Sequence, residues 1–148
     1  HRDLSLKYWG SGAELMSLLA EEEIYVTEGW SGRIYALQEQ GHDIGYMDPP
    51  NGYGWQECLF VIKGSPMEPC EELLNFMLAP ETSIAVAEGQ NYPPALDPQK
   101  VDLGDKIPTL PAFDPTGKLA GLTFADPQYW NSNEADWSKT FGRVQKGY

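Results

Sequence analysis

The chain has 148 residues, of which 22 are acidic and 10 are basic, so its formal net charge is −12. This charge argues against nucleic acids and anionic membrane surfaces as partners, because both are bound by clustered lysine and arginine. Hydrophobic residues make up 41% of the chain, too many for a disordered protein, and no apolar run approaches the roughly 20 residues of a membrane-spanning helix.

The first part of the chain is predicted to alternate between helices and strands. A helix begins at Ser11, which can form a capping box with Glu14 ahead of several leucines. Short segments of strong β-propensity follow, separated by glycines, and the most apolar of them is typical of a buried strand. In order, we predict a helix from Ser11, a strand over 24–27, a helix over 33–40 ended by Gly41, a strand over 42–46, a loop over 48–54 and a strand over 56–63.

The second part is predicted to be mainly helical, interrupted by one long connection. Leucines and a methionine at helical spacing indicate one helix, a second helix follows it, and an aromatic stripe indicates a last one. The elements are helices over 69–78 and 81–88, the second ended by Gly89, a Pro- and Gly-rich surface connection over 91–124, and a helix that begins within 131–133 and carries the stripe Trp137, Phe141 and Val144. Helices alternating with strands make the fold class α/β.

Two segments carry residue types suited to binding a small charged molecule. Arg33 is predicted in the first turn of a helix, where a cation opposes the helix dipole, so its position favours a role in binding a carboxylate. Glu57 stands beside Trp55 at the entry to the predicted buried strand, an arrangement that suits an ammonium group. Plain structural roles stay open on this pattern: Arg33 in a surface ion pair, Glu57 in solvent, and Trp30, Trp55 and Tyr92 as packing residues.

Catalytic and metal-binding patterns are weak. His1 and His42 are the only histidines, and Cys58 has no base near it in the pattern except His42, so an enzyme is a remote alternative. No nucleophile elbow, phosphate loop or dinucleotide fingerprint occurs. Cys58 and Cys70 do not have zinc-site spacing, and they could pair only in an oxidising compartment, so their state stays open. We expect no enzyme, no cofactor and no metal.

Five segments, spread over nearly the whole chain, keep the order and spacing of one known family. They are Val26-Thr27-Glu28-Gly29-Trp30-Ser31-Gly32-Arg33, Gly54-Trp55-Gln56-Glu57-Cys58-Leu59, Leu74-Asn75-Phe76-Met77-Leu78-Ala79-Pro80, Asn91-Tyr92-Pro93 and Tyr129-Trp130-Asn131. On these segments the chain resembles the C-terminal half of a periplasmic solute-binding protein of the spermidine/putrescine-binding family. Such proteins serve ABC importers.

The resemblance implies two α/β lobes with the ligand held in the cleft between them. Residues 1–56 and 103–148 would belong to the second lobe, and residues 57–102 would return to the first. The N-terminal half of the protein would supply the rest of the first lobe, which agrees with a chain that begins at His1 rather than at a methionine. The protein would be periplasmic and would deliver its ligand to an ABC permease in the inner membrane.

The resemblance also implies a set of ligand-binding residues. An aromatic box, an acid that binds an ammonium group and a polar residue near the last helix all have counterparts here. One position departs from the family pattern, because Arg33 stands where putrescine-binding relatives can have an aspartate. The implied set is Trp30, Arg33, Trp55, Glu57, Tyr92 and Asn131.

The arginine changes the expected ligand. Two unit charges about 4 Å apart interact by about 4 kcal/mol at an effective dielectric constant of 20, so Arg33 would repel a diamine and bind a carboxylate. The hypothesis is therefore a short zwitterion such as γ-aminobutyrate, with Arg33 on the carboxylate and Glu57 on the ammonium. The alternatives are a polyamine, with Arg33 turned outward, and a structural or docking module without a saturable ligand.

Overall fold

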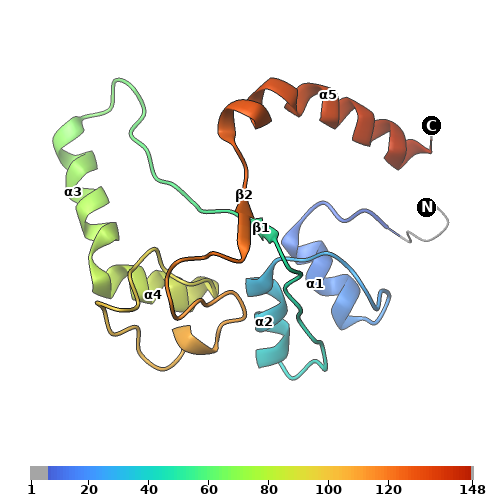
Figure 1. Ribbon diagram of the computed structural model, residues 1–148, viewed down its shortest axis with the longest axis horizontal. Coiled ribbons are helices and arrows are strands. Elements are labelled where there is room, and N and C mark those ends of the chain that lie inside the picture. The colour runs from blue at the N-terminus through green and yellow to red at the C-terminus, as the bar shows by residue number, and fades with distance from the viewer. Residues whose placement is uncertain (1–6, 148) are drawn as a thin grey trace. The chain divides into compact units, whose positions relative to one another are not determined.

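A computed structural model describes residues 7–147 (Figure 1). His1, one of the two histidines considered above for a catalytic role, lies outside this range. Helices dominate the structure and its two strands are short. The elements are α1 (Gly12–Ala20), α2 (Ser31–Glu39), β1 (Gly52–Gly54), α3 (Met67–Leu78), α4 (Pro80–Gln90), the 3₁₀ turn η2 (Ile107–Thr109), β2 (Leu122–Phe124) and α5 (Pro127–Lys146).

The chain divides into two compact units, which we describe separately. The terminal unit consists of His1–Thr27, Pro49–Trp55 and Gly121–Tyr148, and the central unit consists of Glu28–Asp48 and Gln56–Ala120. The terminal unit holds α1, α5 and both strands, whereas the central unit holds α2, α3, α4 and η2. The assignment of segments to the two lobes of a complete protein stays a prediction.

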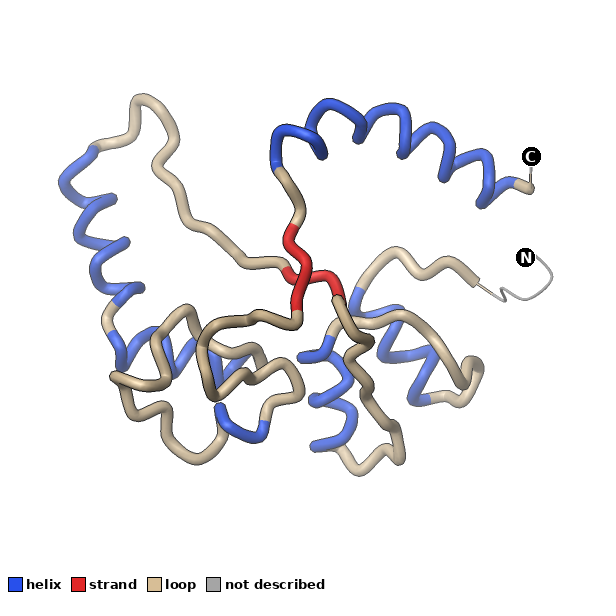
Figure 2. The backbone as a smooth tube through the Cα atoms, viewed as in Figure 1, coloured by secondary structure: helices blue, strands red, loops and turns tan. Residues whose placement is uncertain are grey.

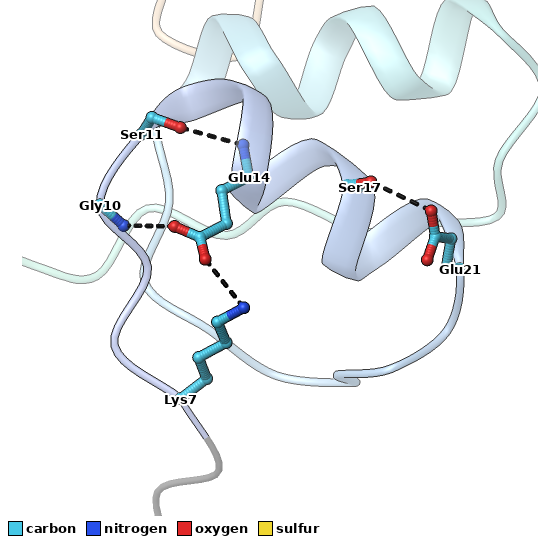
Figure 3. Close-up of polar contacts among 6 residues, drawn as sticks. All are labelled: Lys7, Gly10, Ser11, Glu14, Ser17 and Glu21. Atoms are coloured by element: carbon cyan, nitrogen blue, oxygen red, sulfur yellow. Dashed lines mark hydrogen bonds and ion pairs between the residues drawn. The ribbon is translucent and has the colours of Figure 1, made fainter.

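Helix α1 begins as the sequence predicts (Figure 3). The Ser11 hydroxyl accepts a hydrogen bond from the Glu14 amide at 3.2 Å. The Glu14 carboxylate accepts one from the Gly10 amide at 2.7 Å and pairs with the Lys7 ammonium at 2.8 Å. The capping box is thus present with one change, since Glu14 reaches back to Gly10 rather than to Ser11.

The two strands of the terminal unit form a short parallel pair. Gly52, Tyr53 and Gly54 lie opposite Leu122, Thr123 and Phe124. The end of the predicted 48–54 loop is therefore a strand. A Cβ atom on Gly54 would lie 2.8 Å from the Phe124 ring, so the absence of a side chain there lets the ring pack against the backbone.

Helix α5 begins earlier than predicted. The Asp126 side chain accepts a hydrogen bond from the Tyr129 amide at 2.8 Å, and Pro127 occupies the first turn, where its missing N–H costs nothing. The asparagine-rich region 131–133 lies inside the helix instead of capping it. Aromatic rings contact one another along the helix, with Trp130 and Trp137 edge-to-face and their ring centroids 5.4 Å apart, yet none of the 20 residues of α5 is buried.

The core of the central unit comes partly from the segment predicted as a surface connection. Ala87 of α4 packs with Leu103, Ile107 and Leu110, and Tyr35 of α2 packs against this cluster. The prediction was wrong for 103–110 because a Pro- and Gly-rich chain can bury apolar side chains through turns that have no long-range periodicity. Figure 2 shows how much of the chain runs as loop between helices.

Three predicted strands are not strands in the structure. Residues 24–27, 42–46 and 56–62 are extended or irregular, and the only ladder in the described range joins β1 and β2. Val26, which lies in a predicted strand, is 93% exposed, and Phe60, which was predicted to be buried, is 81% exposed. High β-propensity reflects how well a side chain fits a neighbouring strand, so it predicts a strand correctly only where such a neighbour is present.

The helices of the central unit follow the prediction more closely. Helix α2 begins at Ser31, two residues before the predicted start, and ends before Gly41, which has a positive φ of 91°. Helices α3 and α4 follow one another through Ala79 (Figure 1). Helix α4 runs through Gly89 and ends at Asn91, whose left-handed φ of 61° turns the chain into Tyr92.

Candidate ligand-binding site

The site is built around the start of α2. The N-cap residue is Trp30, whose indole ring offers no oxygen acceptor, so its side chain makes no capping hydrogen bond. The amides of Arg33 and Ile34 bond to the Trp30 carbonyl at 3.0 and 3.2 Å. Ser31 and Gly32 lie between Trp30 and Arg33, and their backbone amides depend on partners from elsewhere in the fold.

Tyr92 supplies one of these partners. Its hydroxyl accepts a hydrogen bond from the Gly32 amide. The approach is close, because a Cβ atom on Gly32 would lie 2.7 Å from the Tyr92 ring and 2.9 Å from the Asn91 carbonyl oxygen. Gly32 is thus the residue that lets the turn after α4 pack against the first turn of α2.

A second tyrosine, Tyr46, is held by Asp48. Its hydroxyl donates to Asp48 Oδ1 at 2.7 Å. Burial, followed by the Asp48 hydrogen bond, raises the pKa of Tyr46 to about 12. The tyrosine is therefore a neutral donor at physiological pH.

Two opposite charges act on the Tyr92 hydroxyl. Burial raises the pKa of Tyr92, the Arg33 guanidinium lowers it, and the Glu57 carboxylate raises it. Arg33 and Glu57, far apart in sequence, therefore both act electrostatically on the same hydroxyl. Both side chains are exposed, and neither takes part in an ion pair among residues 7–147. A cation and an anion held near one tyrosine suit a ligand that carries both charges.

The six predicted ligand residues fall into two groups. Arg33, Glu57 and Tyr92 come together in the central unit, where Trp30 precedes Ser31 as the N-cap of α2. Trp55 follows β1, and Asn131 lies exposed in α5, both in the terminal unit.

Sequence reasoning did not single out Ser31, Tyr46, Asp48 or Asn91 as site residues. No motif predicts that Tyr46 bonds to Asp48, so only the fold shows this contact. The Asn91 side chain is nine-tenths buried, and its Oδ1 has no hydrogen-bond partner in the described part of the chain. Such an oxygen costs stability of about 1–3 kcal/mol.

Other chemistry-bearing groups lie apart from this site or are incomplete. Cys58 is exposed, Cys70 is half-buried, and the two are unpaired. Between residues 7 and 147 there is no group of three His, Cys, Asp or Glu side chains that could hold a metal ion.

A comparison with protein families now places the chain. The family described as bacterial extracellular solute-binding protein matches residues 4–115. The chain belongs to this family. Solute-binding proteins are transport components rather than enzymes, and they work outside the cytoplasmic membrane. Within the described range, no helix combines the length and apolar character needed to span a membrane.

A curated relative gives a finer comparison. The γ-aminobutyric acid-binding protein of Pseudomonas aeruginosa is 26% identical over 144 residues, which cover 93% of this chain. The chain spans 39% of that relative's length. No solved structure gives a significant match.

Proposed function

We propose that the full-length protein is the periplasmic substrate-binding component of an ABC importer and that its ligand is a short zwitterion such as γ-aminobutyrate. The ligand would lie in a cleft between two lobes, and a permease in the inner membrane would receive it. Residues 1–56 and 103–148 would form part of one lobe, and residues 57–102 part of the other.

The observation that carries this proposal is the pair of opposite charges at Tyr92. The Arg33 guanidinium can bind a carboxylate with two parallel hydrogen bonds, and the Glu57 carboxylate can accept from an ammonium group. Both act on the hydroxyl of one tyrosine, so one short molecule could reach both.

The remaining predicted residues would contact the apolar part of the ligand and complete its hydrogen bonds. Trp30, Trp55 and Tyr92 would pack against the methylene groups, which suits large, rigid aromatic rings. Asn131 would add a polar contact. The relative whose printed name specifies γ-aminobutyric acid supports this ligand class.

Polyamine binding is the second candidate. The net charge of −12 and the exposed Glu57 favour a cationic ligand. This candidate requires Arg33 to turn away from the ligand. The effect of Arg33 on the Tyr92 hydroxyl supports the zwitterion instead, since the guanidinium lies near the residue that both ligands would contact.

A fluorescence titration of the full-length protein separates the two candidates. We expect γ-aminobutyrate, and not putrescine, to saturate the tryptophan signal. Arg33→Ala should weaken γ-aminobutyrate binding about 10- to 100-fold, the range for losing hydrogen bonds to a charged group. Arg143→Ala, which removes an exposed arginine from the last turn of α5, is the matched control and should leave the affinity for γ-aminobutyrate unchanged. Saturation by putrescine alone, or unchanged γ-aminobutyrate binding in Arg33→Ala, would contradict the zwitterion.

A further inference from the structure

We propose that Asn91 is a positioning residue of the candidate site: its left-handed backbone conformation directs the ring of Tyr92 onto Gly32, so that Tyr92 is in place before a ligand binds. The inference deepens the proposed function and rests on it, because Tyr92 is one of the residues proposed to contact the ligand. Asn91 itself is not assigned a contact with the ligand.

The turn that Asn91 makes is anchored in the core of the central unit. Helix α4 ends at Asn91, whose φ is 61° and whose ψ is 37°. The amides of Asn91 and Tyr92 both donate to the carbonyl of Ala87, the second of them at 3.2 Å. Ala87 is 5% exposed and belongs to the core cluster. The residue before Tyr92 is therefore fixed in position as well as in conformation.

The chain is also restricted after Tyr92. Pro93 follows, and a proline disfavours the helical region for the residue before it, so extended conformations are favoured for Tyr92. Pro94 restricts Pro93 in the same way. The backbone of Tyr92 is thus constrained from both sides, which leaves the direction of its Cα–Cβ bond little freedom.

The result of these constraints is a close contact with α2. A Cβ atom on Gly32 would lie 2.7 Å from the Tyr92 ring and 2.9 Å from the Asn91 carbonyl oxygen. One turn thus brings two consecutive residues against Gly32, the residue before Arg33. The contact requires a left-handed residue at position 91 as much as it requires a glycine at position 32.

The contribution of residue 91 is its backbone conformation rather than its side-chain oxygen. Asparagine adopts the left-handed conformation more readily than most residues other than glycine. Its side chain is nine-tenths buried, and within residues 7–147 its Oδ1 has no hydrogen-bond partner, so this oxygen does not stabilise the turn. Alanine and glycine both remove the oxygen, but only glycine keeps the left-handed conformation accessible. The two substitutions therefore separate the conformation from the oxygen.

A ring that is in place before binding lowers the cost of binding, because a ligand need not order it. In Asn91→Ala the turn should populate other conformations as well. A ligand would then bind only the fraction of molecules in which Tyr92 lies on Gly32. Its apparent affinity should fall in proportion to that fraction.

Asn51 provides a matched control. It has a similar φ of 59°, it is exposed, and it belongs to the terminal unit. Asn51→Ala introduces the same residue into the same strained conformation, but it does not alter the turn that carries Tyr92. It therefore reports the effect of backbone strain alone.

The test is calorimetric titration of the full-length protein with γ-aminobutyrate. Asn91→Ala should weaken binding about three- to tenfold, as the population of the competent turn falls. Asn91→Gly should restore the affinity to within about twofold of the parent, because glycine permits the turn. Asn51→Ala should leave the affinity within about twofold of the parent while its melting temperature falls.

Equal affinities of Asn91→Ala and Asn91→Gly would overturn the inference, because the conformation would then have no effect on binding. A loss in Asn51→Ala as large as that in Asn91→Ala would also overturn it, since general strain would explain both. If Asn91→Ala does not fold, Pro93→Ala takes its place, because it releases the restriction after Tyr92. Weaker binding by Pro93→Ala would then support the inference, and unchanged binding would reject it.

Failure of the proposed function is a separate outcome, in which the parent does not bind γ-aminobutyrate. If the parent binds putrescine instead, the same variants are compared with putrescine, since both ligands would contact Tyr92. If it binds neither, nuclear Overhauser contacts between the Tyr92 ring and Gly32 decide the positioning role. Contacts that are present in the parent and in Asn91→Gly but lost in Asn91→Ala would support it, and equal contacts in all three would reject it.

Discussion

Helices α1 and α2 are each nine residues long, and they begin in opposite ways. The start of α1 is held by its own neighbours, with the Ser11 hydroxyl on the Glu14 amide and the Glu14 carboxylate on Gly10 and Lys7 (Figure 3). The start of α2 has a tryptophan as its N-cap, and Tyr92, distant in sequence, packs closely against Gly32 in its first turn.

The start of α1 is stabilised by residues close to it in sequence, whereas the start of α2 is stabilised by residues distant in sequence. The α1 cap can form as soon as the helix forms, because all of its groups lie within eight consecutive positions, 7–14. The start of α2 is completed only when Tyr92 has folded back against Gly32, and Arg33 is the next residue. A helix start that breaks the local capping rules is expected where the fold has a further use for it.

The largest effect is expected at the tertiary cap, from Gly32→Ala. The new Cβ atom would lie 2.7 Å from the Tyr92 ring and 2.9 Å from the Asn91 carbonyl, so one of them must move. Overpacking of this kind costs about 1–3 kcal/mol of stability. Thermal denaturation should show a lowered midpoint, and γ-aminobutyrate binding should weaken with it.

Gly89→Ala is the matched control for this substitution. Gly89 lies inside α4, with nothing within 4 Å of an added Cβ atom. Alanine should stabilise the helix by up to about 1 kcal/mol, the difference between the two residues in helix propensity. A lower midpoint for Gly89→Ala, or an unchanged one for Gly32→Ala, would contradict the contrast between the two glycines.

At the local cap, Ser11→Ala should cost about 1 kcal/mol, because the Glu14 amide loses its acceptor. Ligand affinity should not change. Ser17→Ala is the comparison, since the Ser17 hydroxyl donates to the exposed Glu21 carboxylate at 3.1 Å, and the loss of stability should be smaller. Denaturation midpoints and titrations of the same samples test both statements, and a loss of binding in Ser11→Ala would remove the distinction between the two caps.

Asn91→Gly should stabilise the protein by a few tenths of a kcal/mol to about 1 kcal/mol. Glycine adopts the left-handed conformation of Asn91 without steric cost, and the substitution removes the buried Oδ1 that lacks a partner among the described residues. Asn51→Gly relieves a similar φ of 59° at an exposed position. A larger rise in melting temperature for Asn91→Gly than for Asn51→Gly would measure the cost of the buried oxygen, and equal rises would show that it has none.

The smallest effect is the pH dependence of the α1 cap. The Lys7 ammonium and then the Gly10 amide lower the pKa of Glu14, so the folded state binds this proton less readily than the unfolded state. The contribution is present above the unfolded pKa and is lost as pH falls through the lower folded pKa. Between pH 7 and pH 3, Glu14→Gln should therefore lose less stability than the parent. Parallel denaturation curves at both pH values would contradict this assignment.

Much of the helical structure could be predicted because its signals are local. Ser11 with Glu14 indicated the start of α1, and the apolar spacing of Leu73, Leu74 and Met77 indicated α3. Residues 56–63 show the limit of such signals. Their apolar run predicts that Phe60 is buried, but it does not indicate which residues bury it. In the described chain Phe60 is exposed.

The candidate site also has residues that the sequence could name and contacts that it could not. Resemblance to a family named Arg33, Glu57 and Tyr92, and these three lie together in the central unit. The contact between Gly32 and Tyr92 escaped prediction because it depends on how the chain returns after α4, which no local pattern records. A tertiary cap can be recognised only in the folded chain.

The most direct test of the account is a crystal structure of the full-length protein with γ-aminobutyrate. We predict the ligand carboxylate on the Arg33 guanidinium, its ammonium on the Glu57 carboxylate, and the Tyr92 ring still packed against Gly32. A ligand with its two ends reversed, or an Arg33 side chain that points away from an occupied site, would contradict the account.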